Sequence, residues 1–163
     1  MADSTNKKAL VRRYERETLA GWIKPSSFLQ PEGVELTSEQ GETRILPYPE
    51  VKAIYFVRDW NGGLPTRQAF QTRPKMTGLW IKLRFRDGEI LEGIIPNNLM
   101  NLESGGFSVI PPDPFANTQR VFVPRSALIG VEVLGVVGSP LRQRKEKAAP
   151  EVQPGLFDQP AEP

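Results

Sequence analysis

The sequence predicts an all-β protein made of two tandem five-stranded small barrels, followed by a disordered C-terminal tail. Three observations support this prediction. Short apolar segments alternate with polar residues at period two, which is the pattern of half-buried strands. Sixteen prolines and fourteen glycines in 163 residues favour turns over long helices. Finally, a strand–turn–strand pattern in residues 83–95 has a weaker copy in residues 11–23.

The second repeat, residues 78–137, has the clearer pattern. Apolar and polar side chains alternate over residues 79–86, which predicts a strand with one apolar and one basic face. Asp87-Gly88 predicts a tight hairpin turn, because glycine accepts the positive φ that such turns need. Gly93 in the return strand predicts a bend or a close approach of two backbones. Further strands are predicted at residues 107–110, 120–123 and 129–137, with a short turn at residues 125–128.

The first repeat, residues 9–60, follows the same order with a weaker pattern. Its strands are predicted at residues 9–14, 17–23, 33–38 and 43–47, with a short turn and a fifth strand in residues 49–57. Identical residues at a spacing of 72 are Arg12/Arg84, Glu17/Glu89, Leu19/Leu91 and Gly21/Gly93. Pro47 and Pro124 align the ends of the repeats at a spacing of 77. Because each repeat is near the lower size limit for folding alone, the two are expected to meet edge to edge and protect their strand edges.

Three segments lie outside the predicted barrels. Residues 1–8 are expected to be a flexible N-terminus. Residues 61–77 are polar and contain both glycine and proline, so a mobile linker is expected. Residues 138–163 combine prolines and mixed charge with few apolar residues, which predicts a disordered tail.

The composition restricts the chemistry that the chain can perform. It contains no cysteine and no histidine, so thiol nucleophiles, thiolate metal sites and imidazole bases are excluded. Carboxylates such as Asp87 and Asp113 form no paired-acid pattern. We therefore expect a protein that is not an enzyme and that needs no cofactor or metal.

The chain shows no sign of membrane insertion or export. It lacks an apolar run of about 18 residues, the length that a spanning helix needs. Residues 1–10 contain no apolar stretch typical of a secretory signal. A cytoplasmic protein without membrane contact is expected.

The motif Gly88, Leu91, Gly93, then Met100-Asn101-Leu102, resembles the first motif of the Sm-like family of RNA-associated β-barrels. The resemblance implies an Sm-like or SH3-like barrel, with bases contacted by the loop at Met100 and Asn101 and by a second loop at Arg125. The sequence departs from the family in a shorter loop after Gly93, in lacking the usual acidic residue, and in having Arg125-Ser126 instead of Arg-Gly. A structural loop that packs Met100 and Leu102 is the alternative.

Residues 10–134 as a whole also resemble an uncharacterised bacterial family of tandem small barrels. That resemblance carries no known activity. The barrel fold is therefore implied for the whole region, whereas the RNA site is implied only for the second repeat.

The basic face of the strand at residues 79–86 is a candidate surface for RNA or single-stranded DNA. Its residues are Trp80, Lys82, Arg84 and Arg86. Cationic side chains beside an aromatic ring can follow a phosphate backbone while bases stack on the ring. The alternative is a solvated outer face, with Glu89 and Glu92 as cross-strand partners. The net charge of +2 gives no further support for a nucleic-acid partner.

Two further groups of residues suggest weaker alternatives. Arg12 and Arg16 have the R-x-x-x-R spacing of cyclic-dinucleotide-binding barrels of the PilZ type, and residues four apart in a strand share a face that can clamp a phosphate. The second motif of that family is missing. Phe115, Asn117 and Arg120 lie in a proline-bounded loop that forms either a binding lip or a cover over one barrel end.

The tail contains a short motif, QPGLF, at residues 153–157. It resembles the peptide that binds the bacterial sliding clamp, in which a glutamine precedes a leucine and a phenylalanine. The resemblance implies that Leu156 and Phe157 fill an apolar pocket while Gln153 fixes the register. Two functional hypotheses follow: an adaptor associated with nucleic acid, and a protein-interaction module that docks on the sliding clamp.

A peptide of residues 151–159 is expected to bind a bacterial sliding clamp. The double substitution Leu156→Ala/Phe157→Ala should weaken binding by roughly tenfold or more, because each anchoring side chain typically contributes more than about 1 kcal/mol. Fluorescence anisotropy with the two labelled peptides measures the difference. Equal binding of both peptides would contradict the hypothesis.

Overall fold

Ten strands build the part of the chain that the computed structural model describes, residues 5–138 with the side chain of Leu99 excepted. The tail motif with Gln153, Leu156 and Phe157 lies outside these residues. The prediction of an all-β protein is confirmed. Within residues 5–138, every helix is too short or too polar to cross a membrane.

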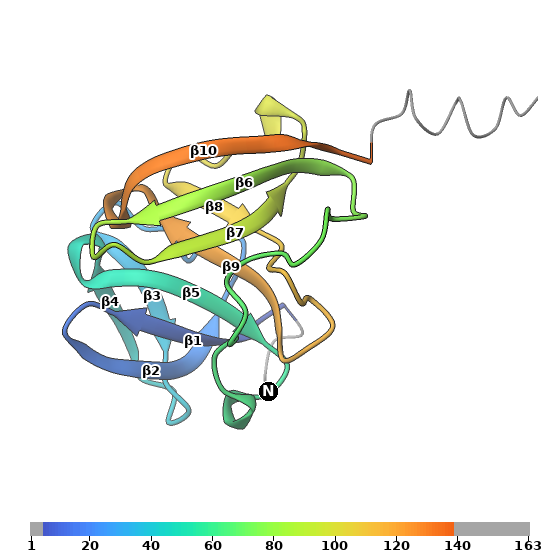
Figure 1. Ribbon diagram of the computed structural model, residues 1–163. Helices are drawn as coiled ribbons and strands as arrows, with labels where there is room; N and C mark the ends of the chain where they lie inside the picture. The colour runs from blue at the N-terminus through green and yellow to red at the C-terminus, as the bar shows by residue number, and fades with distance from the viewer. Residues whose placement is uncertain (1–4, 139–163) are drawn as a thin grey trace, which may run out of the picture.

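The elements of the first repeat follow the predicted order (Figure 1). They are β1 (Lys7–Arg13), β2 (Arg16–Ile23), β3 (Gly33–Thr37), β4 (Thr43–Pro47), the 3₁₀ turn η1 (Tyr48–Glu50) and β5 (Val51–Val57). Another 3₁₀ turn, η2 (Trp60–Gly62), begins the connection to the second repeat.

The second repeat has the same order of elements, with one extra 3₁₀ turn. They are β6 (Gly78–Phe85), β7 (Ile90–Ile95), η3 (Leu99–Asn101), β8 (Gly106–Val109), β9 (Thr118–Pro124), η4 (Arg125–Ala127) and β10 (Leu128–Val137). All ten predicted strands are therefore present, with small shifts at their ends.

Both repeats pair their strands in the same register. Val11 of β1 lies opposite Ile54 of β5. In the second repeat Leu83 of β6, 72 residues after Val11, lies opposite Val131 of β10, 77 residues after Ile54. These are the two spacings at which the sequence repeats, so β6 to β10 are the counterparts of β1 to β5.

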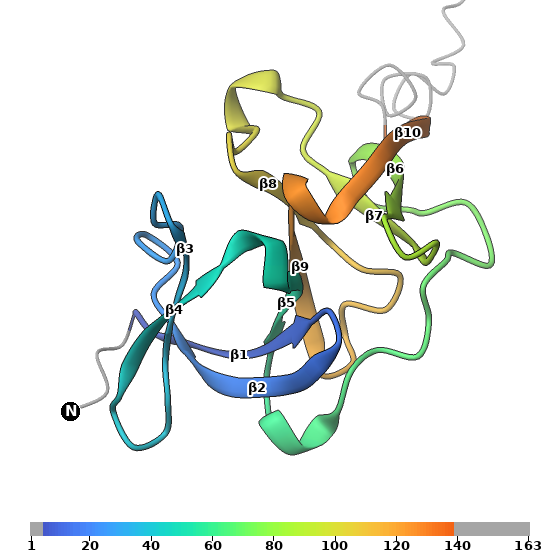
Figure 2. The same cartoon turned by 90° about the vertical axis from the view of Figure 1, so that its left-hand side faces the viewer.

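The strands form two open sheets, and the predicted pair of closed five-stranded barrels is not shown. One sheet has the order β4-β3-β2-β1-β5-β9-β8, and the other has the order β10-β6-β7. β9 pairs with β5, which places Ile54 opposite Phe122, and β8 pairs with β9. β7 meets this sheet only at an isolated bridge between Ile94 and Ile110. The repeats thus meet edge to edge, as expected, and both contribute strands to the seven-stranded sheet (Figure 2).

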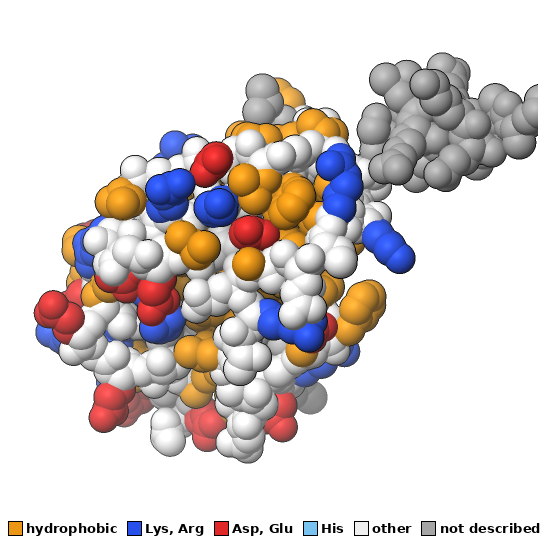
Figure 3. Space-filling view, viewed as in Figure 1, with side chains coloured by type: hydrophobic (Ala, Val, Ile, Leu, Met, Phe, Trp, Pro, Cys, Tyr) orange, Lys and Arg blue, Asp and Glu red, His pale blue; other side chains and the backbone are white. Residues whose placement is uncertain are grey.

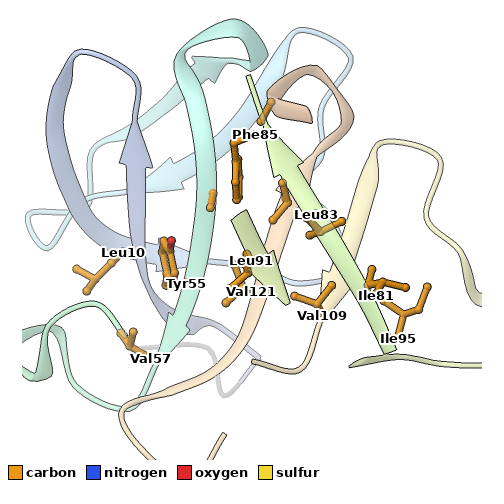
Figure 4. Close-up of a cluster of buried hydrophobic side chains, with 13 residues drawn as sticks. Leu10, Tyr55, Val57, Ile81, Leu83, Phe85, Leu91, Ile95, Val109 and Val121 are labelled. Carbon is orange, nitrogen blue, oxygen red and sulfur yellow. The ribbon is translucent and has the colours of Figure 1, made fainter. Parts of the chain in front are cut away.

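The shared sheet separates two hydrophobic clusters. Phe122 of β9 is fully buried among residues of the first repeat, such as Ile54. On the other face, Ala53 and Tyr55 of β5 complete the cluster of the second repeat (Figure 4). Burial of one such large side chain contributes roughly 1.5–3 kcal/mol. Each repeat therefore supplies side chains to the core of the other.

The segment between the repeats contacts the second repeat along its length. The carbonyl of Gln68 accepts a hydrogen bond of 2.7 Å from the amide of Glu92. The ring of Phe70 meets Trp80 edge to face, and a guanidinium nitrogen of Arg73 donates to the carbonyl of Val136 at 2.7 Å. These contacts do not measure motion, so the expected mobility of residues 61–77 stays a prediction.

Gly93 marks a close approach of β7 to β8, as the sequence predicts. A Cβ at this position would lie 2.7 Å from the Cβ of Val109, closer than two carbon atoms can normally approach. Val109 is buried and paired with Val121 of β9, so a side chain at position 93 would strain the second core.

Gly93→Ala is expected to lower the free energy of unfolding by about 1–3 kcal/mol, the usual cost of overpacking. Gly130→Ala is the matched control, because a Cβ there meets open space and its counterpart in the first repeat is Ala53. Urea unfolding of the two variants measures the difference. Equal stability would show that β7 and β8 can separate freely.

Candidate functional site

The predicted basic face lies on the outer side of the sheet β10-β6-β7, where it is flanked by carboxylates. Lys82 lies opposite Glu132 on one side and Glu92 on the other. Arg84 forms an exposed ion pair of 3.3 Å with Glu132. Figure 3 shows acidic and basic side chains together on this part of the surface. The predicted cross-strand role of Glu92 is thus observed, whereas Glu89 points elsewhere.

Trp80 is held by contacts within the protein. Its indole nitrogen donates to the carboxylate of Glu92 at 3.1 Å, and its ring meets Phe70 at 6.1 Å. The backbone amide of Phe70 donates to the same carboxylate at 3.0 Å. These contacts orient the ring and leave less of it available for stacking on a base.

Arg86 belongs to the contact between the repeats and not to the outer face. Its guanidinium lies 3.9 Å from the centre of the Tyr14 ring and donates to the carbonyl of Pro49. The hydroxyl of Tyr14 donates to the carbonyl of Ala127 at 2.9 Å. Partial burial raises the pKa of Tyr14, so the hydroxyl keeps its proton at neutral pH.

Four charged residues, which we call the junction network, connect the repeats beside Arg86. They are Arg12, Lys52, Asp87 and Glu89. The Nζ of Lys52 lies 2.7 Å from Glu89 and also pairs with Asp87. Arg12 donates two hydrogen bonds to Glu89, at 3.0 and 3.1 Å. The side chain of Lys52 is 3% exposed, so its charge depends on these two carboxylates.

The network holds both carboxylates in their charged forms. Hydrogen bonds from Lys52 and Arg12 lower the pKa of Glu89. Partial burial favours the neutral form of Asp87, but hydrogen bonds from Lys52 and from the amide of Glu89 outweigh it and lower this pKa too. A lowered folded-state pKa gives stability that is present above the ordinary value, 4.5 for Glu89, and is lost as the pH falls through the folded-state value.

Sequence reasoning missed Lys52, although the sequence carries a signal. Lys52 is the only charged residue in the apolar strand at residues 51–57. A lysine in such a strand needs a buried partner, since an unpaired buried charge is costly. The partner itself lies in the other repeat and cannot be read from the local pattern.

The alternative phosphate clamp at Arg12 and Arg16 is occupied by carboxylates. Arg12 is bound to Glu89, and Arg16 lies 3.8 Å from Glu50. The described residues include no group of three side chains suited to hold a metal ion.

A groove of about 520 Å³ opens beside the β5–β9 ladder, and we call it the junction groove. Phe56 of β5 and Arg120 of β9 lie opposite each other in the ladder, and both line it. Its other main residues are Lys7, Phe28, Glu103 and Ser108. Two phenylalanines of the first repeat, one cation from each repeat and apolar side chains such as Met76 and Ile110 therefore line one concave surface.

Glu103 gives the junction groove an unused hydrogen-bond acceptor. Its Oε1 accepts from the hydroxyl of Ser108 at 3.1 Å. Its Oε2 is buried and has no hydrogen-bond partner among the residues that the structure describes. A buried acceptor without a partner is uncommon in folded proteins, so this oxygen needs a donor that the protein itself does not supply.

The two loops that the Sm-like resemblance singled out lie apart from each other, and only the first adjoins the junction groove. Asn101 and Leu102 line a second cavity, of about 140 Å³, which shares Glu103 and Arg120 with the junction groove. Met100 is 90% exposed, so the alternative of a loop that packs Met100 is wrong. Arg125 lies over the ring of Phe107 at 5.4 Å and lines a separate hollow.

A family model matches residues 5–135, and its description is a family of unknown function (DUF6982). The chain belongs to this family. The match includes both repeats and the segment between them, so DUF6982 is defined by the pair of repeats. The prediction of membership in an uncharacterised domain family is thereby confirmed. Comparisons with curated proteins and with solved structures give no match.

Lys52→Met is expected to lower the free energy of unfolding by about 1–3 kcal/mol at neutral pH. This is less than for a fully buried pair, because both carboxylates reach solvent. The loss should shrink as the pH falls below 4.5, since protonated carboxyls no longer need Lys52. Urea unfolding from pH 3 to 7 measures it.

The control for Lys52→Met is Arg16→Met, which removes an exposed ion pair of 3.8 Å and should change stability by less than about 0.5 kcal/mol. A loss for Lys52→Met that does not depend on pH would indicate a packing role for Lys52 instead of a charge role.

Proposed function

We propose that the protein is a non-enzymatic binding module that holds single-stranded RNA or DNA in the junction groove. One observation carries this proposal: Arg120 lies opposite the partly buried ring of Phe56 at the rim of a groove that Lys7 also lines. Single-stranded nucleic acids are bound by this combination, because cations follow the phosphates and aromatic rings stack on the bases.

The junction groove also offers a contact that distinguishes bases. The Oε2 of Glu103, which is buried and has no hydrogen-bond partner among the described residues, would accept a hydrogen bond from an exocyclic amino group once the side chain turns into the groove. Asn101, in the adjoining cavity, adds a donor and an acceptor. Unpaired bases expose the whole Watson–Crick edge, which paired bases use for each other. We therefore propose a preference for single strands.

The outer face of β6 supports the same function less well. Arg84 there forms an ion pair with Glu132, and Lys82 lies between Glu132 and Glu92 in the strand register without an ion pair of its own among the described residues. Phosphate would have to compete with these carboxylates. In the junction groove, Lys7 and Arg120 form no ion pair within 4 Å in the described part of the chain.

We further propose that each repeat is an Sm-like small barrel that has opened at its contact with the other repeat. The order of five strands and the single 3₁₀ turn before the fifth strand, η1 and η4, support this relation. The bend at Gly93 supports it as well, because it lets β7 cross closely over Val109.

Lys7→Ala/Arg120→Ala is expected to weaken the binding of a fluorescein-labelled single-stranded 12-mer by about tenfold or more at low salt. Two lost phosphate contacts should also reduce the slope of log affinity against log salt by about 1.4. Fluorescence anisotropy at several salt concentrations measures both quantities.

Lys82→Ala/Arg84→Ala is the matched control, since it removes the same number of positive charges from the outer face. It should change the affinity by less than about threefold. Absence of salt-dependent binding by the unmodified protein would overturn the proposed function. Loss of binding in the Lys82/Arg84 variant alone would overturn the location in the junction groove.

A further inference from the structure

Two edge strands lie at opposite ends of the structure, β4 on the seven-stranded sheet and β10 on the three-stranded sheet (Figure 2). β10 presents exposed apolar side chains, among them Val131 at 42% and Val133 at 59% exposure. On β4, Ile45 is 45% exposed. A ten-residue edge strand with apolar side chains favours pairing with another strand.

The internal repeat shows which strand fits each edge. β5 is the counterpart of β10, and β9 is the counterpart of β4, because each pair is related by the spacing of 77. Inside the chain, β5 of the first repeat pairs antiparallel with β9 of the second repeat. The same contact made once more would join β10 of one copy to β4 of a second copy.

The observed ladder also sets the register of this contact. Ile54 lies opposite Phe122, and Tyr55 lies opposite Val121. Shifting both strands by the repeat spacing places Val131 opposite Ile45 of the second copy. It places Glu132 opposite Arg44. The first pair is apolar on both sides and the second has opposite charges, so the two edges are complementary in this register.

The counterpart of Ile45 shows what this side chain would do. Phe122 projects from the second repeat into the core of the first, where it is fully buried beside Ile54. Ile45 occupies the same position on β4 and has no such core to enter within the chain. Beside Val131 of another copy, it would be covered in the same way.

A second contact between the repeats can be repeated with the same charges. Arg12 on β1 binds Glu89 of the second repeat through two hydrogen bonds. Their counterparts at a spacing of 72 are Arg84 and Glu17, so the residue types are identical. Glu17 is exposed at the start of β2, and Arg84 is exposed on β6, where its ion pair with Glu132 of the same chain reaches solvent. The second copy would thus bring Glu17 to Arg84.

We propose that the protein self-associates head to tail, with β10 of one copy pairing antiparallel with β4 of the next in the register Val131–Ile45 and Glu132–Arg44. The contact joins two different surfaces, so its repetition gives a closed ring or an open array. This inference does not depend on the proposed function, because the junction groove lies beside the β5–β9 ladder.

Charge reversal tests the register directly. Arg44→Glu alone and Glu132→Arg alone are each expected to reduce the assembly to monomers, because like charges then face each other. A 1:1 mixture of the two variants restores an opposite-charge pair at every contact, and so does the double variant. Light scattering coupled to size-exclusion chromatography measures the mass of each sample.

Both side chains are exposed, so thermal unfolding of Arg44→Glu should match that of the unmodified protein. Glu132→Arg also removes the exposed ion pair with Arg84, so a small fall in its unfolding midpoint is expected. A monomeric unmodified protein at high micromolar concentration would overturn the proposal. Single variants that assemble as well as the unmodified protein, or a mixture that fails to restore the assembly, would overturn it too.

Cross-linking gives an independent test, because the chain contains no cysteine of its own. Oxidation of an Ile45→Cys variant mixed with a Val131→Cys variant should give a disulfide-linked dimer, since directly opposite strand positions lie within disulfide range. Ile90→Cys in place of Val131→Cys is the control, because Ile90 is also exposed but lies on β7. Equal yields from both mixtures would overturn the register.

Discussion

The ladder between β5 and β9 is the contact on which the rest of the structure depends. It joins the two repeats through backbone hydrogen bonds and sends side chains to both faces of the shared sheet. Phe122 enters the first core, while Tyr55 enters the second. Neither repeat can therefore complete its core alone, and a unit of about fifty residues would be marginal in any case. The protein folds as a pair because each half is missing a part that the other half supplies.

The same ladder explains why Lys52 can be buried. The start of β5, where Lys52 lies, is covered by the hairpin turn of the second repeat, which carries Asp87 and Glu89. A shift of the hairpin along β5 would leave Lys52 without a carboxylate, at a cost of about 3–5 kcal/mol for a buried pair. The junction network thus acts mainly by destabilising other placements of the hairpin along β5, and less by stabilising the fold itself. At the other end of the ladder, Phe56 and Arg120 meet in the junction groove.

Local sequence patterns predicted the ten strands, the turns and the spacing of the repeats, because alternation, glycine and proline act within a few residues. They did not predict the sheets, since the pairing of β5 with β9 depends on which edges meet after folding. They also predicted the basic face of β6 without showing that Glu132, on a strand 46 residues after Arg86, would neutralise it. Local patterns did not predict the junction groove either, because Lys7 and Arg120 come from different repeats.

The identities that reveal the repeat have two different causes. Gly21 and Gly93 are required by close strand contacts, and Leu91 is buried, so local packing accounts for them. Packing does not account for the identity of Arg12 with Arg84 or of Glu17 with Glu89, because all four side chains reach the surface. Arg12 and Glu89 bind each other across the repeats, whereas their counterparts Arg84, which pairs with Glu132, and Glu17 do not bind each other within the chain. One copy of the contact is made within the chain. The other can be made only between two chains, which is the geometry that the exposed edges of β4 and β10 also favour.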